Sequence, residues 1–318
     1  MVAASRLAAQ PSNKPSIRVR ALNHMTLFVS DPKRSLEFYQ GLFGMPVQAR
    51  QGNSGGLLRI GPGPQFIALA AAGPNRKPGI DHFCMTAEGF NAGQILKILA
   101  EHGVTKSEAA GPLKAWERMR GETLEFHLGD PDGIVVQLQD PRYCGGGGVL
   151  GNACLATPEP PPRKGLIAVR DLSHFTLSVS DPNRSREFYR GVFGMRIQAY
   201  QGASPILAVG PGPQFLALGG GGANGGGTPG IAHACLTMEG FSPDKVLKIL
   251  ADFGIKPRGE ARGPASPMVS YVSMRMEDRG GAKGGTPELY FTDPDGIVMQ
   301  LQDVRYCGGS GYLGEVCL

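Results

Sequence analysis

Three side chains suited to holding a metal ion lie on separate strand-like stretches in the first half of the chain. They are His24, His82 and Gln137, and around each of them apolar and polar residues alternate. Alternate residues of a strand point to opposite sides, so these polar side chains should face away from the apolar core and line one concave surface. Neutral imidazole suits iron, manganese, zinc or nickel, and an amide oxygen can complete the set. The pattern therefore predicts a divalent metal site.

The second half of the chain carries the same set in the same order, as His174, His233 and Gln300. A single histidine on a strand is more often a hydrogen-bonded wall residue than a ligand. Two on separate strands, present twice, make ligation about as probable as the structural alternative.

The two sets belong to a repeat of domain length, because residues 24–154 reappear as residues 174–317. We expect domains at 18–155 and 166–318, each burying its own core, joined by a proline-rich spacer at 156–165. Residues 1–17 are interpreted either as a disordered tail or as the remnant of an export signal.

Each copy should consist of two successive β-α-β-β-β units, which gives an α+β fold. The pattern in the first copy predicts a strand at 22–30, a helix at 33–44, short strands near 57–61 and 65–70, then a strand at 79–86, a helix at 91–103 and a hairpin at 124–140. The apolar faces of the strands are expected to pack on the helices. The second copy has a longer Gly-rich segment at 264–285, which is a candidate lid.

Composition excludes several classes of protein. With 318 residues, a net charge of +5 and scattered basic residues, the chain is not predicted to bind nucleic acid, and no apolar run could cross a bilayer.

Each copy ends in two cysteines separated by ten residues, and glycine between them would let Cys144 meet Cys154 and Cys307 meet Cys317. Such disulfides favour an exported, periplasmic location, and reduced thiols in the cytoplasm are the alternative. Cys84 and Cys235 are interpreted as structural.

The motifs HxTLxVSDPxRSxEFYxGxFGM and DPDGIVxQLQD, present in both copies, resemble the vicinal oxygen chelate (VOC) superfamily. It includes glyoxalase I, bleomycin-resistance proteins, fosfomycin-resistance enzymes and extradiol dioxygenases. The resemblance implies two tandem VOC domains whose sheets curl around a central cavity, with the two His/His/Gln sets as metal ligands. The chain departs from the family in having Gln where the last-strand ligand is usually Glu, and in having Ala68 and Ala217 at a further glyoxalase ligand position.

The resemblance also implies two catalytic candidates. Tyr290 stands where extradiol enzymes have a substrate-contacting tyrosine, and His127 occupies the same place in the first copy. His127 is either a general base or, as the favoured alternative, ordinary strand surface. Trp116, Arg118 and Arg120 either contact an aromatic or anionic ligand or, as favoured, anchor a packed loop.

The leading functional hypothesis is a metal-dependent enzyme for a small oxygenated, aromatic or catecholic substrate. The reaction is best interpreted as extradiol-type dioxygenation, with lyase or isomerase chemistry behind it and Fe²⁺ or Mn²⁺ favoured over Zn²⁺ or Ni²⁺. The rival is a metal-free binding protein of the bleomycin-resistance kind. A third hypothesis makes one copy active, in which case the second copy is preferred for Tyr290 and its longer segment. A homodimer is also considered.

Overall fold

The computed structural model describes residues 16–51, 56–220, 228–259 and 265–318. The first copy consists of β1 (Val19–Val29), α1 (Pro32–Phe43), β2 (Val47–Ala49), β3 (Leu57–Arg59), β4 (Phe66–Ala71), β5 (Gly79–Ala87), α2 (Ala92–Glu101), β6 (Thr105–Lys106), β7 (Lys114–Arg120), β8 (Thr123–Gly129) and β9 (Val135–Gln139). The second consists of β10 (Val169–Val179), α3 (Pro182–Phe193), β11 (Ile197–Gln201), β12 (Ser204–Ala208), β13 (Phe215–Gly220), β14 (Gly230–Met238), α4 (Pro243–Asp252), β15 (Lys256–Pro257), β16 (Val269–Arg275), a 3₁₀ turn (Glu277–Arg279), β17 (Thr286–Thr292) and β18 (Val298–Asp303).

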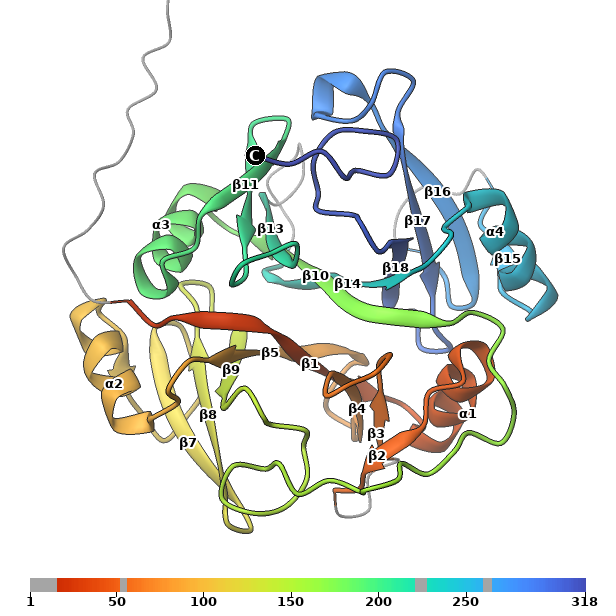
Figure 1. Cartoon of the computed structure of the whole chain (residues 1–318). Coiled ribbons are helices and arrows are strands. Elements are labelled where there is room, and N and C mark those ends of the chain that lie inside the picture. Colours follow the sequence, from red (N-terminus) through yellow and green to blue (C-terminus); the bar gives the residue numbers. More distant parts are fainter. Residues whose placement is uncertain (1–15, 52–55, 221–227, 260–264) are drawn as a thin grey trace, which may run out of the picture.

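Each copy forms one nine-stranded sheet within the described residues (Figure 1). The strands follow the order β2-β3-β4-β1-β5-β9-β8-β7-β6 in the first copy and β11-β12-β13-β10-β14-β18-β17-β16-β15 in the second. The order places the two β-α-β-β-β units side by side along β1 and β5. The predicted paired units and the α+β class are confirmed, and three strands of the first copy, β2, β6 and β7, lie where the sequence predicted none.

Local signals account for the helix that follows the first strand. The Asp31 carboxylate accepts hydrogen bonds from the backbone N–H groups of Lys33 and Arg34, and Pro32 fits the first turn. The helix ends at Gly44, whose φ of 65° few other residues adopt without strain. This short, well-ended helix returns the chain to the sheet for β2.

The apolar faces of the two sheets pack on the helices, as expected, and also against each other. One continuous hydrophobic cluster contains residues of both copies. Phe83 of β5 stacks on Phe175 of β10 with ring centroids 4.9 Å apart, and Phe43 of α1 lies 5.9 Å from Phe291 of β17. In Figure 1, β1 and β10 run beside each other across the middle of the molecule. The copies therefore share a core.

The DPDG turns of both hairpins join the copies through a reciprocal pair of hydrogen bonds, called here the tyrosine latch. The Tyr39 hydroxyl donates to the buried Asp293 carboxylate, and the Tyr189 hydroxyl donates to Asp130, each over 3.1 Å. Beside the latch, Arg184 forms an ion pair with Asp132 at 2.6 Å. Arg34 and Asp295 repeat that contact on the other side. The motif that the sequence marks as a turn is thus also an interface between copies.

The proline-rich segment at 156–165 lies against the first copy. Glu159 forms a β-bridge with Val47 at the edge of the sheet and an ion pair with Arg50. Gly165 packs so closely on Phe43 and Gly44 that a Cβ atom there would contact backbone. The segment is extended, as predicted, and it is fixed in place.

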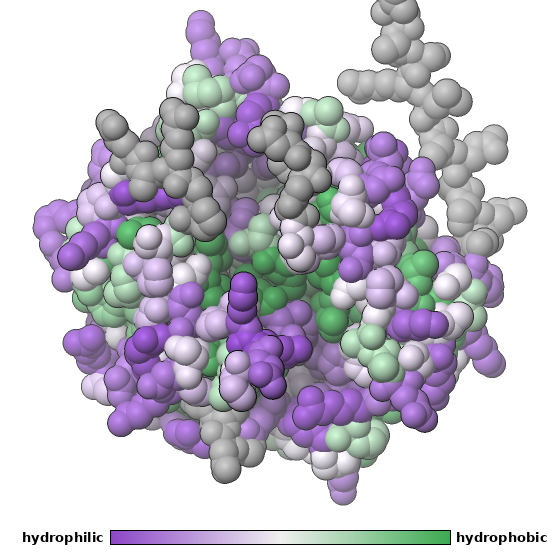
Figure 2. All heavy atoms as spheres, turned by 180° about the vertical axis from the view of Figure 1, so that it is seen from behind, coloured by the Kyte–Doolittle hydropathy of each residue, from purple (hydrophilic) through white to green (hydrophobic). Residues whose placement is uncertain are grey.

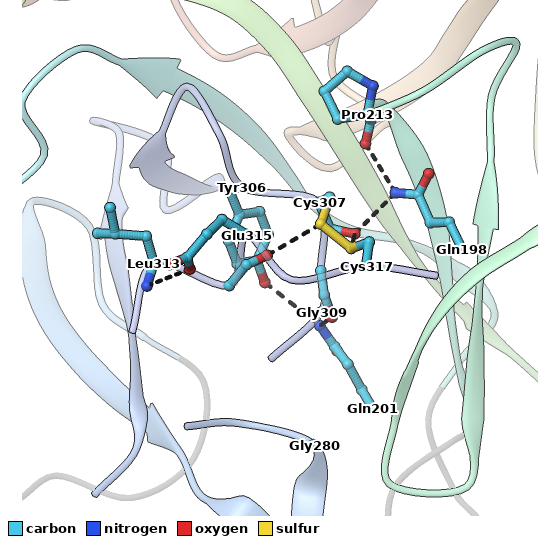
Figure 3. The surroundings of a disulfide bond; sticks show 12 residues. Gln198, Gln201, Pro213, Gly280, Tyr306, Cys307, Gly309, Leu313, Glu315 and Cys317 are labelled. Carbon is cyan, nitrogen blue, oxygen red and sulfur yellow. Dashed lines mark hydrogen bonds between the residues drawn. A yellow bond between two sulfur atoms is a disulfide. The ribbon is translucent and has the colours of Figure 1, made fainter. Parts of the chain in front are cut away.

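Both predicted tail disulfides, Cys144–Cys154 and Cys307–Cys317, are formed. Figure 3 shows the second one beside Gln198, whose amide donates to the backbone carbonyls of Cys307 and Pro213. Gln48 makes the equivalent bond to Cys144 in the first copy. Each disulfide therefore closes a loop that covers one end of its own sheet.

The predicted tail at 1–17 lies outside the described residues up to residue 15. The described face in Figure 2 is mainly hydrophilic, with apolar side chains gathered near its centre. Among the described residues, no helix is long and apolar enough to span a membrane.

Candidate functional site

The predicted set of the first copy meets in one cavity of about 400 Å³. Nε2 of His24 and Nε2 of His82 lie 3.1 Å and 3.0 Å from Oε1 of Gln137. Strand register produces this meeting, because Cys84 of β5 is opposite both His24 of β1 and Gln137 of β9, with His82 two residues away on the same side. Three strands thus bring their potential metal-ligand atoms to one point.

In both imidazoles, a hydrogen bond at Nδ1 fixes which ring nitrogen carries the proton. Nδ1 of His82 donates to Asp81 over 2.7 Å. Nδ1 of His24 donates to Oδ1 of Asn23 over 2.7 Å, and the Asn23 amide is held in this orientation because its N–H donates to the Tyr143 carbonyl. Both Nε2 atoms therefore present lone pairs to Gln137, which is the tautomer that a metal ligand needs.

Nε2 of His82 also lies 3.1 Å from the Thr26 hydroxyl, which can donate to it, but no proton lies between either Nε2 and Oε1 of Gln137, so these acceptors repel one another unless a cation sits among them. The Gln137 amide nitrogen, by contrast, is buried with no hydrogen-bond partner in the described structure. The donor set therefore fits a divalent cation. No group of three His, Cys, Asp or Glu side chains in the described ranges is arranged to hold a metal, so a metal site here would need the Gln137 amide oxygen as its third ligand.

Burial and nearby positive charge lower the pKa of His24 and of His127. Burial lowers the pKa of His24 well below its usual value, and the neighbouring His82 lowers it further. His127, at a ring distance of 5.6 Å from His82, has a pKa lowered to about 4, mainly by burial. Neutral imidazoles bind metal without first losing a proton, so the site is ready for a cation at neutral pH.

His127 lines the cavity and is buried, so its placement differs from the favoured interpretation as strand surface. The Trp116 indole stacks on it at 5.5 Å and an interplanar angle of 10°. Trp116, Arg118 and Arg120 belong to β7 instead of a packed loop, and both arginines line the cavity. His127, with Trp116 stacked behind it, and two arginines therefore lie beside the predicted ligands.

The sequence prediction missed an ionic network in the same wall. Arg120 forms an ion pair with Glu125 at 2.6 Å and donates to the Tyr143 hydroxyl, which in turn donates to Glu125. The second copy repeats the ion pair and the tyrosine contact with Arg275, Glu288 and Tyr306. Their recurrence at matching places in both copies was the signal that could have identified them.

The second copy places its predicted set in a smaller cavity of about 190 Å³. The rings of His174 and His233 lie 5.5 Å apart, and Gln300 lines the same cavity. Tyr290 lines this cavity, contacts His233 edge-on, and its hydroxyl donates to Glu288 over 3.1 Å. All eight predicted site residues thus line one of two matching cavities.

The two sites differ in what supports their ligands. Ala232 stands where the first copy has Asp81, and Ser173 stands where it has Asn23. The Ser173 hydroxyl lies 3.3 Å from Nδ1 of His174, and no carboxylate contacts His233 Nδ1 within the described residues. The first copy therefore holds its imidazoles more firmly and with more negative charge.

The predicted lid overlaps residues 260–264, which are not described, and its described part lies in and around the β16–β17 hairpin. Where the first copy has two residues between β7 and β8, the second has the ten residues 276–285. Gly280 packs against the Tyr200 carbonyl of β11, and Arg279 lines the cavity. This segment reaches across from one edge of the site to the other.

Buried Cys84 and Cys235 are free thiols, as predicted, and burial raises the pKa of each well above its usual value. Neither is therefore a thiolate near neutral pH, so both are structural.

Two curated enzymes are similar in sequence to parts of the chain. The chain is 28% identical over 123 residues to the glutathione transferase FosA of Serratia marcescens, which covers 38% of the chain and 80% of that enzyme. It is 28% identical over 150 residues to the lactoylglutathione lyase of Escherichia coli O157:H7, covering 41% of the chain and 98% of that enzyme.

Solved structures resemble the chain over almost its whole length. The catechol dioxygenase BphC matches 92% of the chain and 87% of its own with a TM-score of 0.60 at 16% identity. A Mn(II)-bound glyoxalase from Novosphingobium aromaticivorans matches 90% and 82% with a TM-score of 0.61, also at 16% identity. The family model described as Glyoxalase/Bleomycin resistance protein/Dioxygenase superfamily matches residues 21–138 and 171–301, so the chain belongs to this superfamily and carries two of its domains.

Proposed function

We propose that the first copy is the metal centre of an enzyme for a small oxygenated, aromatic substrate. The observation that carries this proposal is the meeting of two imidazole lone pairs and one amide oxygen within 3.1 Å, with the imidazole protons held on the far nitrogens. A divalent ion bound by His24, His82 and Gln137, with Fe²⁺ or Mn²⁺ favoured, would supply Lewis acidity and open positions for two adjacent substrate oxygens.

The other residues of the cavity have defined roles in this proposal. Neutral His127 accepts a proton from a substrate hydroxyl, and its stack with Trp116 offers a flat surface for an aromatic ring. The Arg120–Glu125–Tyr143 network keeps the wall rigid. Asp81 orients His82 through its hydrogen bond to Nδ1.

Extradiol-type dioxygenation is the preferred reaction. It is supported by the aromatic surface, the open positions left by a three-residue site and the fold similarity to catechol dioxygenases. Lyase or isomerase chemistry of the glyoxalase kind is the next candidate, supported by the similarity to lactoylglutathione lyases. Oxygen uptake with catechols, measured against formation of an isomer without oxygen, separates the two.

We choose the first copy in preference to the second, which reverses the choice made from sequence. The first copy has the larger cavity and the Asp81 support, whereas Tyr290, one of the two reasons for preferring the second, has its hydroxyl engaged by Glu288. Replacing His24 and His82 together by Ala should abolish turnover. The matched pair His174→Ala and His233→Ala should leave most of it.

A metal-free binding protein is the second candidate, and one observation favours it. Turning the Gln137 amide over would let its two N–H groups donate to both imidazoles, which would satisfy the cavity without an ion. Metal analysis of anaerobically purified protein decides between the candidates. Less than one bound ion per chain, and no thermal stabilisation by Fe²⁺, Mn²⁺, Zn²⁺ or Ni²⁺, would leave the binding protein.

We further propose that the chain works in an oxidising compartment such as the periplasm. Two disulfides in matching tails support this location. Thiol alkylation of protein taken directly from cells tests it, because a cytoplasmic chain would have six modifiable cysteines and an exported one only two.

A further inference from the structure

One cationic side chain in the first cavity is left without an opposite charge. Four charged residues line this cavity, namely Asp81, Arg118, Arg120 and Glu125. Arg120 pairs with Glu125 at 2.6 Å, and Asp81 pairs with Arg76 at 3.0 Å. Arg118 of β7 is exposed and has no ion pair within the described part of the chain, because Glu125, which lies opposite it in the strand register, pairs with Arg120 instead. The wall therefore carries one uncompensated positive charge.

An exposed arginine is usually only a solvated charge, so a second observation is needed. The second copy has Ser273 in place of Arg118, yet its cavity is lined by Arg279, an exposed arginine from the 276–285 segment. Arg279 also has no ion pair among the described residues. Two different elements thus bring an arginine without an ion pair to equivalent cavities. This indicates that the ligand of each cavity requires a positive charge, and that the arginine is not simply an exposed residue of one strand.

We propose that each cavity binds a carboxylate at its mouth through this arginine. For the first copy, the substrate is then a planar compound that has two adjacent oxygens at one end and a carboxylate at the other. This inference rests on the proposed function for the oxygens and on Arg118 for the carboxylate. The planar guanidinium fork can donate two parallel hydrogen bonds to a carboxylate, which a point charge cannot.

The Trp116–His127 stack supports the planar form of the ligand. The stack and Arg118 lie on the same strand pair, because Trp116 and Arg118 are two residues apart on β7 and share its cavity side. A flat ring beside this stack can keep its carboxylate within reach of Arg118 while its oxygens point to His24 and His82. Aliphatic acids lack this contact and should bind more weakly.

Calorimetric titration of the full chain tests the proposal, with Mn²⁺ present and oxygen excluded. The probes are 3,4-dihydroxybenzoate, catechol and benzoate. The wild-type chain should bind 3,4-dihydroxybenzoate about 10-fold more tightly than catechol. Arg118→Gln should remove this preference and leave catechol affinity unchanged, whereas Lys114→Gln, the same loss of charge on the same strand but outside the cavity, should change neither.

Equal affinities of the wild-type chain for the two catechols would overturn the proposal, as would a preference that survives Arg118→Gln, or binding of neither carboxylate. Benzoate separates this failure from that of the metal site, because it lacks the adjacent oxygens. If no metal binds, weaker benzoate binding in Arg118→Gln still supports the arginine site. Arg279→Gln should remove a second benzoate binding event and leave the first.

Discussion

Asp81 offers the sharpest test of why the first copy, and not the second, should hold metal. Its carboxylate accepts a 2.7 Å hydrogen bond from Nδ1 of His82, and both side chains are mostly buried, with 24% and 13% exposed. Hydrogen bonds to a charged group are worth about 1.5–3 kcal/mol. Replacing Asp81 by Ala should therefore weaken metal binding by about 10- to 100-fold, the range found for residues that support metal ligands.

The reciprocal substitution Ala232→Asp places a carboxylate at the matching position of the second copy. It should raise metal affinity there by about 10-fold, although Ser173 still supports His174 less firmly than Asn23 supports His24. Titration of Mn²⁺ against a chromophoric chelator gives both affinity and stoichiometry. The wild-type chain should bind one ion tightly, Asp81→Ala none tightly, and Ala232→Asp two.

Asp81 also pairs with Arg76, whose side chain is half exposed, so its loss must be separated from that of the ion pair. Arg76→Gln is the control and should change metal affinity less than 3-fold, because exposed ion pairs contribute little. The reasoning fails if wild-type chain binds two ions with equal affinity, or if Asp81→Ala binds metal as tightly as wild type.

Three further predictions concern pH and the tails. Burial raises the pKa of Asp130 and Asp293 from 3.8 to about 6, so the native state holds their protons more tightly; the stability they confer is full below about pH 4 and is lost as pH rises through 6. Each group should lower the free energy of unfolding by about 2–3 kcal/mol between pH 4 and pH 7. In urea unfolding across this pH range, the double substitution Asp130→Asn with Asp293→Asn should make the free energy of unfolding less dependent on pH. Turnover should stay level down to about pH 5 if His127 is the base, since its pKa is about 4, and a fall centred near 6.5 would argue against it. Replacing both Cys144 and Cys154 by Ser should lower the free energy of unfolding by about 2.5–3 kcal/mol, because the unfolded chain gains loop entropy. The thermal unfolding midpoint should fall, and reducing that disulfide in the wild-type chain should lower the midpoint by the same amount.

The sequence was sufficient to predict on which side of each strand the site residues lie. Alternation along three strands placed His24, His82 and Gln137 on one side, and the repeat showed that the arrangement occurs twice. Such alternation depends only on backbone geometry, which is local. That is why the cavity linings were predicted, and why Met25 and Phe83 were correctly assigned to the opposite, buried face.

The partners of those buried faces were not predictable in the same way. Alternation marks which side of a strand is apolar but not every surface that covers it, and here both the helices and the other copy cover the sheets. Trp116 illustrates the same limit, because β7 alternates bulky, charged residues that read equally well as a loop. The role of Asp130 depends on Tyr189, 59 residues away in the other copy.

The shared core explains why a copy without its own metal would still be required. Met25, Leu27 and Phe83 are fully buried in a cluster that includes Phe175 and Leu177 of the other copy. Each such side chain contributes about 1.5–3 kcal/mol by leaving water. The second copy also supplies Tyr189 and Asp293 to the tyrosine latch. We therefore expect residues 16–155 expressed alone to aggregate or to pair with themselves across this face, which size-exclusion chromatography detects. A monomeric, cooperatively folded fragment would show that each copy is sufficient for its own core, and the second cavity would then need a function of its own to explain its presence.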